Sequence, residues 1–318
     1  MGMTTLDNRA AMTGQPLATV TICTRNRAAS LARTLASIVE AARAVSEDWE
    51  LLVVDNGSTD DTSEVVDGFA GCLPIHRILH SVPGLSNARN AGVAAARGRF
   101  IIWTDDDLTV DRAWLAAYLA AFRTWPDCAI FGGRAIPRYA EPVPAWFLAC
   151  EDDLASLLAI RDAPDWDEIT PERVPYGLNY AVRTDVQRAH PYDPELGVAP
   201  GRRLGGEETG MIRAALRSGV RGRWVWGATV HHLIPPERQT AAYIFRYYRA
   251  HGFRFPDLPV EDARPLRLSQ AAGIAGRLGR KATMAALRRL RGEPAWVRSF
   301  ISFARTVGTI DRLRGGRV

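Results

Sequence analysis

The sequence predicts an α/β protein built on a doubly wound sheet of mainly parallel strands, and two observations support this prediction. Short apolar segments alternate with segments of helical periodicity over the first hundred residues, and repeats of this kind place consecutive strands parallel. Acidic residues directly follow two of the expected strands, at the sheet edge where such folds bind ligands. The 318 residues are 47% apolar and 24% charged, which suits a globular protein with a sizeable core.

A change in the spacing of apolar residues marks the first two strand–helix units. Residues 17–23 are short, apolar and β-branched, as expected for a buried strand, and residues 30–44 have helical periodicity. A second apolar run at 50–54 is the next strand, and residues 61–69 form a short helix after it.

The next two units follow the same order. Residues 75–79 are the third strand, and the Ala-rich segment 85–96 is a helix that Gly98 stops. The apolar run 100–103 is a fourth, buried strand, and 114–123 is helix-like. This alternation predicts the doubly wound sheet.

The rest of the chain suggests a division into parts. Segments 137–144 and 162–175 are rich in Pro and acidic residues and are expected to be loops that separate the first half from a second half beginning near Ala129. The predicted parts are a flexible leader at 1–16, a main domain at 17–255 with halves 17–128 and 129–255, and a helical tail at 256–318.

Cysteine usage and hydropathy predict a cytoplasmic setting. The four cysteines lie far apart without a CxxC pair, which argues against a zinc site or a disulfide framework. No 18 apolar residues run together, so no transmembrane helix is expected, and the leader lacks the apolar core of a signal peptide.

The net charge of +5 is unevenly distributed. Residues 264–318 carry thirteen Lys or Arg against two acids, a net charge of +11, which leaves −6 for residues 1–263. Apolar residues alternate with the basic ones, which predicts an amphipathic helical pair. Two alternatives remain open: the tail packs its apolar stripe on the main domain, or it docks on an anionic membrane. No nucleic-acid-binding motif is present, so no nucleic-acid partner is expected.

Acidic residues follow two expected strands directly. Asp105, Asp106 and Asp107 come after the strand at 100–103, and three adjacent carboxylates repel one another, which favours a bound cation shared with a diphosphate. The alternative is an N-terminal cap for the helix at 114–123. Asp55 ends the second strand, where its carboxylate can accept a hydrogen bond from a base or a ribose hydroxyl.

Two further polar segments lie at expected strand–helix junctions. Residues 23–27 lead into a helix whose free amides can meet an anion, although an ordinary turn would look the same. Segment 84–92 opens the third helix, and its Arg89 is expected to pair with an acid on a neighbouring strand.

Together these segments resemble the family 2 glycosyltransferases of the GT-A fold. The matching segments, in order and spacing, are TICTRNR at 21–27, VDNGSTD at 54–60, GLSNARN at 84–90 and the acidic DXD-type motif at 105–107. The resemblance covers about residues 17–255. It implies a GT-A fold with a single Rossmann-like mixed sheet flanked by helices, and with the tail as a C-terminal helical appendage.

Three downstream segments extend the resemblance. Residues 174–183 are similar to the acceptor-side segment of that family, which includes Asn179. Glu207 and Glu208 match its acidic pair, whose second member is the usual catalytic base, although Asp is commoner there; the alternative is that both cap a helix at 209–218. The strand containing His231 and His232 matches one that returns to the metal, and alternation lets only one reach it, for which His232 is preferred.

The resemblance implies a role for each candidate residue. Glu208 is the expected base, and Asp107 with His232 would hold Mn²⁺ or Mg²⁺, the imidazole favouring Mn²⁺. Residues expected on the donor side are Thr24, Arg25, Asn26, Arg27, Asp55, Asn87, Arg89, Asp105 and Asp106. Residues expected on the acceptor side are Gly133, Arg134, Asn179 and Glu207.

The implied activity is inverting, metal-dependent transfer of a sugar, of the hexosyltransferase type, in cell-surface polysaccharide, glycolipid or related glycoside synthesis. The donor would be a nucleotide-diphosphate sugar of the UDP, GDP or dTDP type, and the acceptor a hydroxyl of a carbohydrate, a lipid-linked sugar or another molecule. The expected location is cytoplasmic, with the inner face of the plasma membrane as the site of any peripheral attachment.

Two other functions remain open from the sequence. One is a catalytically lapsed nucleotide-sugar-binding or scaffold protein of the same fold, which the Glu at 208 weakly favours. The other is a sugar-phosphate nucleotidyltransferase, but such enzymes carry a Gly-rich loop after the first strand, and residues 23–27 contain no glycine.

Overall fold

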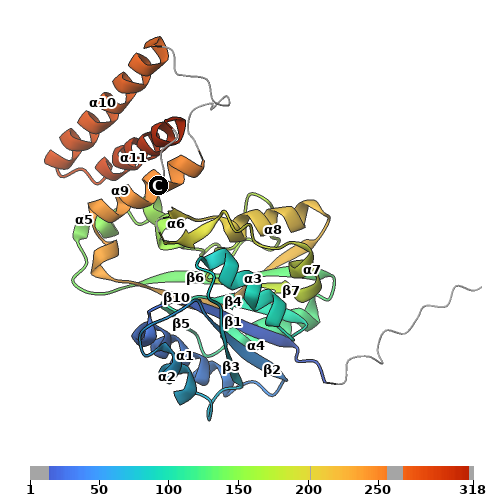
Figure 1. Ribbon diagram of the computed structural model, residues 1–318. Coiled ribbons are helices and arrows are strands. Elements are labelled where there is room, and N and C mark those ends of the chain that lie inside the picture. The colour runs from blue at the N-terminus through green and yellow to red at the C-terminus, as the bar shows by residue number, and fades with distance from the viewer. Residues whose placement is uncertain (1–13, 201, 256–267, 315–318) are drawn as a thin grey trace, which may run out of the picture.

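A mixed eight-stranded sheet forms the centre of the protein (Figure 1). The computed structural model describes residues 14–200, 202–255 and 268–314. The strand order is β3-β2-β1-β4-β7-β6-β10-β5, and a two-stranded sheet pairs β8 with β9. The strands are β1 (Ala18–Thr24), β2 (Trp49–Asp55), β3 (Ile75–Leu79), β4 (Phe100–Thr104), β5 (Leu108–Val110), β6 (Cys128–Tyr139), β7 (Asn179–Arg183), β8 (Gly197–Ala199), β9 (Arg202–Leu204) and β10 (Arg221–Ile234).

Helices flank this sheet and continue beyond it. They are α1 (Ala28–Ala42), α2 (Thr62–Gly68), α3 (Leu85–Ala95), α4 (Trp114–Thr124), α5 (Ala145–Leu148), α6 (Ala155–Leu158), α7 (Thr184–Ala189), α8 (Glu207–Arg217), α9 (Ala241–Arg254), α10 (Leu268–Leu290) and α11 (Trp296–Leu313). Short 3₁₀ turns occur at Asp152–Leu154 (η1) and Pro236–Arg238 (η2). The predicted α/β class with a sheet flanked by helices is confirmed, and the expected strands and helices begin and end within about two residues of the observed ones.

Strand directions explain how the sheet is wound. β1, β2, β3 and β4 are parallel, so their carboxyl ends share one edge. β7 is antiparallel to both β4 and β6, β10 runs parallel to β6, and β5 is antiparallel to β10. The sheet is therefore the predicted mixed one, with its parallel half first in the chain.

The structure contradicts one local expectation and one of the alternatives left open by the sequence. The stretch 137–144 is not all loop, because β6 continues to Tyr139, which pairs with Ile234 of β10. Asp105, Asp106 and Asp107, called the triplet below, do not cap α4, because β5 lies between them and α4 has Ala113 at its N-cap. A three-residue strand is too short to show a period in the sequence.

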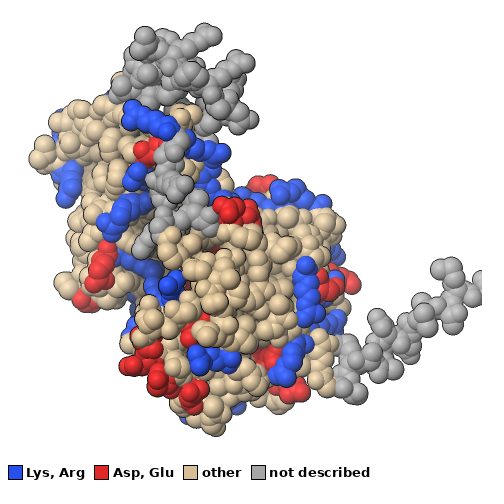
Figure 2. Space-filling model, in the orientation of Figure 1, with Lys and Arg blue, Asp and Glu red and all other residues tan. Residues whose placement is uncertain are grey.

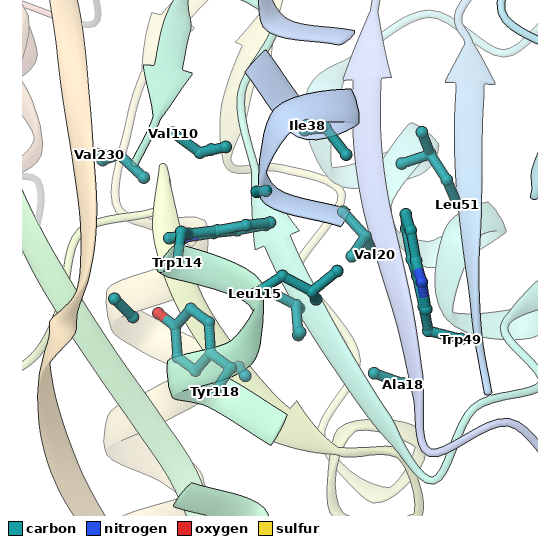
Figure 3. Close-up of a cluster of buried hydrophobic side chains, with 14 of the residues drawn as sticks. Ala18, Val20, Ile38, Trp49, Leu51, Val110, Trp114, Leu115, Tyr118 and Val230 are labelled. Atoms are coloured by element: carbon teal, nitrogen blue, oxygen red, sulfur yellow. The ribbon is translucent and has the colours of Figure 1, made fainter. Parts of the chain in front are cut away.

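Side chains of the buried strands alternate between two cores. Phe100 and Ile102 of β4 pack with α1 and α4 on one face, whereas Ile101 and Trp103 pack with α3, α7 and α8 on the other. Figure 3 shows part of the first core, where Trp114 and neighbouring residues of α4 face the side chains of β1 and β2. The core thus holds the sheet rigid between two helical layers.

A third apolar cluster joins the C-terminal helices to the rest of the protein. It contains side chains of α5, α6, β10, α9 and α11. α9 and α11 cross very closely: an added Cβ at Gly308 would lie 1.9 Å from the carbonyl oxygen of Arg249, and one at Gly252 would lie 2.0 Å from that of Arg305. α11 therefore packs on the domain, and α10 packs along α11, far from the sheet (Figure 1).

Some sequence-based expectations fall on residues without a description. Residues 1–13 of the expected leader and 256–267, where the tail was expected to start, lie outside the described residues. Of the helices in the described part of the chain, none combines the length and the apolar character that crossing a membrane requires.

Candidate functional site

The candidate site lies where β1, β2 and β4 end at one edge of the sheet. Asp105, Asp106 and Asp107 leave β4 at this edge and lead straight into β5. β5 pairs antiparallel with β10, with Leu108 opposite His232. The register of this short pairing is what brings His232, more than a hundred residues away in sequence, beside Asp107.

Asp107 is surrounded by cationic and imidazole groups. Its Oδ2 lies 3.9 Å from His232 Nε2, 2.8 Å from Arg238 Nη2 and 3.1 Å from Arg27 Nη1. Burial by itself would raise the pKa of Asp107, but the neighbouring guanidinium groups of Arg238 and Arg27 lower it below its usual value. Asp107 is therefore a carboxylate at neutral pH.

His232 is buried and held in one orientation. Its Nδ1 lies 2.8 Å from the carbonyl oxygen of Leu158, which assigns the proton to Nδ1 and turns the Nε2 lone pair toward Asp107 and Arg238. Burial lowers the pKa of His232, so the imidazole is neutral. His231 points to the opposite face, where its Nε2 lies 2.6 Å from Asp111 Oδ1. Strand alternation separates the two histidines as the sequence predicts.

The pair of Asp107 and His232 fits a divalent cation as part of its ligand set. Carboxylate oxygen and neutral imidazole are ligands that Mn²⁺ accepts, and a carbonyl that fixes the imidazole is a common support for such a ligand. Among the described residues, no group of three His, Cys, Asp or Glu side chains could hold an ion. The protein thus offers two ligands, and phosphate oxygens or water would have to complete the set.

Asp106 joins the end of β4 to the end of β1. Thr24 Oγ1 donates to its Oδ2 at 2.6 Å, and Arg27 Nη1 donates to its Oδ1 at 2.6 Å. Burial raises the pKa of Asp106 in spite of the Arg27 charge. The rest of this loop faces outward: Arg25 is exposed, and Asn26 accepts a hydrogen bond from the Thr59 amide at 2.7 Å.

Asp55 is held in place by hydrogen bonds from within the protein. It is buried, and it accepts hydrogen bonds from the Ser58 amide at 2.8 Å and from Arg77 at 3.1 Å.

The next residue, Asn56, was not singled out from the sequence. Its amide donates to the carbonyls of residues 80 and 82 and accepts from the Gly84 amide, which ties β2 to the start of α3. A polar residue directly after a strand-ending acid was the available signal.

Arg89 links the acidic triplet to α8. It is buried, and its guanidinium lies 3.1 Å from Glu207 Oε1 and 3.7 Å from Asp105 Oδ1. It also donates to the Gly177 carbonyl at 3.3 Å. Burial opposes its charge, but surrounding groups, Tyr180 and Glu207 foremost, raise the pKa of Arg89 well above its ordinary value. The acid partners expected for Arg89 therefore come from α8 and from the end of β4.

Glu207 and Asp105 share this crowded environment. Burial and the charge of Glu208 raise the pKa of Glu207 to about 7, against the attraction of Arg89, and Glu207 Oε2 is buried without a hydrogen bond. Asp105 also has its pKa raised to about 7, by desolvation and by Asp107 and Asp106 against the effect of Arg89. The Asp105 side chain is 40% exposed, however, and this contact with solvent moderates the rise.

Glu208 has the more open position of the acidic pair. Both acids lie in the first turn of α8, where carboxylates favour the helix dipole, so a helix-stabilising role and a catalytic one are compatible. Glu207 is committed to Arg89, whereas Glu208 is half-buried, and its charge raises the pKa of both Asp105 and Glu207. It is thus the acid of this pair that can reach a proton of a bound molecule.

Three of the residues expected on the acceptor side have internal partners. Asn179 accepts from Trp114 and Tyr118 and donates to the carbonyls of Arg134 and Ala228, all within 2.9 Å. An added Cβ at Gly133 would lie 2.2 Å from the Asn179 amide nitrogen. The Arg134 guanidinium pairs with Asp162 at 2.7 Å. The first two residues hold β6, β7 and β10 together.

Asn87 is the last of the expected donor-side residues. It lies in the first turn of α3, half-buried, and its amide donates to the Pro83 carbonyl at 2.9 Å. Contacts thus join residues 105–107 to Thr24, Arg27, Arg89, Glu207 and His232. Among the described residues, Arg25, Asn87, Arg134 and Asn179 make no hydrogen bond or ion pair with these groups.

Proteins named for polysaccharide biosynthesis or sugar transfer resemble this chain over most of its length. A model of the family "Glycosyl transferase family 2" matches residues 19–141. The succinoglycan biosynthesis protein ExoM of Rhizobium meliloti is 30% identical over 266 residues, which are 80% of this chain and 79% of ExoM. A glucosyl-dolichyl phosphate glucuronosyltransferase of Haloferax volcanii is 24% identical over 220 residues, 67% of this chain and 68% of that protein.

Solved structures share the fold at lower identity. The mannosyltransferase PcManGT of Pyrobaculum calidifontis, in complex with GDP-Man and Mn²⁺, has a TM-score of 0.61 at 18% identity over 94% of this chain and 87% of that one. Residues 1–349 of S. aureus TarS, in complex with UDP, give a TM-score of 0.52 at 15% identity over 94% and 91% of the two chains. Fold and sequence agree, and the chain belongs to the family 2 glycosyltransferases of the GT-A fold.

Proposed function

We propose that this glycosyltransferase moves a sugar from a nucleoside-diphosphate donor to a hydroxyl acceptor with inversion at the anomeric carbon. The proposal rests on one observation: residues 105–107, His232 and two guanidinium groups meet at one sheet edge, and Glu207 of α8 is joined to them through Arg89. Solved structures of the same fold hold GDP-Man or UDP, which supports a donor of this class.

The donor side of the site supplies recognition and charge neutralisation. Asp55, at the end of β2, would meet the base, and the partly exposed Asp105 would meet the ribose. Asp107 and His232 would hold a divalent cation, which would neutralise charge on the diphosphate as it leaves. Arg27, beside Asp106 and Asp107, would add a second positive charge near the leaving group.

The base step falls to Glu208. As the acceptor oxygen forms its bond to the anomeric carbon, the bond from that carbon to the diphosphate breaks, and the diphosphate keeps the electron pair. The hydroxyl proton passes to the Glu208 carboxylate. One in-line displacement of this kind inverts the anomeric configuration.

Replacing Glu208 by Gln tests the proposed activity. The variant keeps the shape of the side chain but cannot take a proton, so turnover should fall by about 10²–10⁴-fold while donor binding is retained. Turnover would be measured with a panel of UDP-, GDP- and dTDP-sugars, and donor binding by calorimetry, with Glu64→Gln on α2 as the matched control. A wild-type protein that binds a donor without transfer or hydrolysis would instead indicate a lapsed enzyme.

We infer the acceptor class and location from the helical appendage and the relatives. The relatives are named for succinoglycan biosynthesis and for a dolichyl-phosphate-linked sugar, which supports an acceptor in polysaccharide or lipid-linked glycan synthesis. The four cysteines are unpaired, in keeping with a cytoplasmic location. Basic and apolar side chains on the outer surface of α10 would attach the enzyme peripherally to the inner face of the plasma membrane.

A further inference from the structure

Arg238 lies between the two residues that would hold the cation. It is at the end of η2, just after β10, and its guanidinium donates from Nη2 to Asp107 Oδ2 at 2.8 Å. The other terminal nitrogen, Nη1, lies 2.9 Å from His232 Nε2. Because Nδ1 of His232 carries the ring proton, Nε2 is the acceptor, so Arg238 contacts both ligand atoms at once.

These two ligand atoms are close enough together to share one small cation. Two donors at ~2.1 Å from the same ion lie no more than about 4.2 Å apart, and Asp107 Oδ2 and His232 Nε2 are 3.9 Å apart. His232 Nε2 has one lone pair, and it points at the Arg238 guanidinium. The guanidinium and a divalent cation therefore exclude each other from this nitrogen, and so from the pair.

Arg27 does not compete in the same way. It approaches Asp107 Oδ2 at 3.1 Å, but its shorter contact, 2.6 Å, is with Asp106, and no contact joins it to His232. Arg27 can give up Asp107 and keep a carboxylate partner. Among the described residues that contact Asp107, only Arg238 bridges it to His232.

We propose that Arg238 is a built-in cation that holds Asp107 and His232 until the divalent cation arrives with the nucleoside diphosphate, and that it then turns to the diphosphate oxygens. This inference rests on the proposed cation site. Its physical basis is charge: Asp107 is a half-enclosed carboxylate whose charge is compensated before and after the exchange, first by Arg238 and then by the metal. The displaced guanidinium meets a new anion, the diphosphate, in the same place.

The exchange predicts cooperative binding. A cation that arrives alone has to break the contacts of Arg238 without offering it another anion, so it binds weakly. A cation that arrives with a diphosphate offers that anion, so each ligand raises the affinity of the other by the same factor. Arg238 also turns into a ligand of the leaving group, which makes it a positioning residue before donor binding and a binding residue afterwards.

Titration of the full-length protein with Mn²⁺ alone tests the inference, followed by the spin-resonance signal of free Mn²⁺ or by calorimetry. Arg238→Gln removes the competing charge and keeps most of the side-chain length, so Mn²⁺ should bind about tenfold or more tightly than to the wild type. In the same variant, UDP or GDP should raise Mn²⁺ affinity less than it does in the wild type. Arg112→Gln is the matched control, since that side chain is 87% exposed and remote from the triplet in its contacts.

Two further variants keep the test decisive. Arg238→Lys retains the charge but loses the two-pronged contact, and it should give an intermediate Mn²⁺ affinity even if the Gln variant folds poorly. Combining Asp107→Asn with Arg238→Gln should abolish the gain in Mn²⁺ affinity. This loss would show that the ion binds at Asp107. Folding of each variant is checked by circular dichroism and by Tm.

The outcomes separate this inference from the proposed function. If the wild type and Arg238→Gln bind Mn²⁺ equally tightly, the cation site stands and the role of Arg238 is wrong. If neither binds Mn²⁺, with or without nucleotide, both the exchange and the metal part of the proposed function are wrong. Nucleotide binding that persists in chelator and is lost in Arg238→Gln would mean that Arg238 replaces the cation permanently.

Discussion

Two adjacent glutamates at the start of α8 have unequal environments. Glu207 is buried against Arg89 with one oxygen unpartnered, whereas Glu208 keeps solvent contact. The raised pKa of Glu207, about 7 against 4.5 for an ordinary glutamate, means that burial and the Glu208 charge outweigh the attraction of Arg89. The sequence suggests an acidic pair, but it does not show this inequality, which depends on the buried position of Arg89.

The Glu207 environment gives a pH-dependent prediction. A carboxyl whose pKa is raised on folding contributes stability that is fully present below about pH 4.5 and is lost as the pH rises through about 7. Gln does not titrate and resembles the protonated acid. The Tm of Glu207→Gln relative to wild type should therefore rise by a few degrees between pH 5 and pH 8, since ~1 kcal/mol moves Tm by about 2–4 °C in a domain of this size.

Thermal unfolding at the two pH values, in the absence of nucleotide, measures this difference. Glu64→Gln, on the exposed surface of α2, should show a difference that does not change with pH. A Tm difference for Glu207→Gln that falls toward pH 8 would show that the ion pair with Arg89 is favourable overall and that the ionised form is the stable one.

At the scale of the secondary-structure element, hydrophobic periodicity predicts the long strands and helices but not the short ones. β2 and α3 were expected nearly to the residue because their apolar runs and helical periods are unbroken. β5 has three residues and no period, yet its pairing with β10 is what sets His232 beside Asp107. Most of the candidate residues were thus available from the sequence, although Arg238 and Asn56 were not singled out. The contacts among these residues depend on long-range register.

The crossing of α9 and α11 shows the same limit. Gly308 and Gly252 lie inside α11 and α9, where glycine lowers helix propensity, but in the structure they allow the two backbones to approach closely. Asp311 of α11 also accepts from Arg249 of α9 at 2.6 Å. These contacts favour the alternative in which part of the tail packs on the domain.

Gly308→Ala tests this crossing. The added Cβ would lie 1.9 Å from the Arg249 carbonyl oxygen, a backbone atom that cannot turn aside, so α11 has to move. We expect a loss of about 1–3 kcal/mol and faster proteolysis of α10 and α11. Gly279→Ala on α10 is the matched control, because nothing lies within 4 Å of its added Cβ and the helix gains propensity. Equal stability of the two variants would contradict the close crossing.

At the scale of the whole molecule, the sequence shows that the C-terminal segment is basic but not which surface of the protein carries this charge. The excess of basic residues near the C-terminus was evident, and the α/β class followed from the alternation of elements. What could not be read is that α11 uses its apolar side chains against α5, α6 and α9, while α10 remains outermost. α11 thus follows the packing alternative, and membrane docking stays a proposal for α10.

The outer surface of α10 combines the features of a membrane-surface helix. Met284, Leu287 and Leu290 are 40%, 48% and 85% exposed, although all three are apolar. The exposed basic residues of the same helix and of the turn after it are Arg277, Arg280, Arg289 and Arg291. Figure 2 shows several Lys and Arg patches and few acidic ones at the end of the molecule that carries α10 and α11.

Binding to vesicles tests whether this surface attaches to lipid. The purified protein should float with vesicles that contain phosphatidylglycerol at low salt and much less with pure phosphatidylcholine, because each basic residue near an anionic surface contributes about 1 kcal/mol. Replacing Arg277 and Arg280 by Gln should weaken binding by about tenfold or more, and added salt should weaken the wild type similarly. The matched control replaces the exposed Arg33 and Arg43 of the α1 region by Gln.

The pattern of the results identifies the surface that binds. Loss of flotation in the α10 variant but not in the control would assign attachment to α10, and it would leave the sheet edge with the triplet as a separate surface for donor and acceptor. Equal binding of both variants would mean that general positive charge, and not this helix, holds the protein on lipid. If the wild type does not float with anionic vesicles at low salt, the exposed apolar side chains of α10 do not bind membrane, and the proposed peripheral location is wrong.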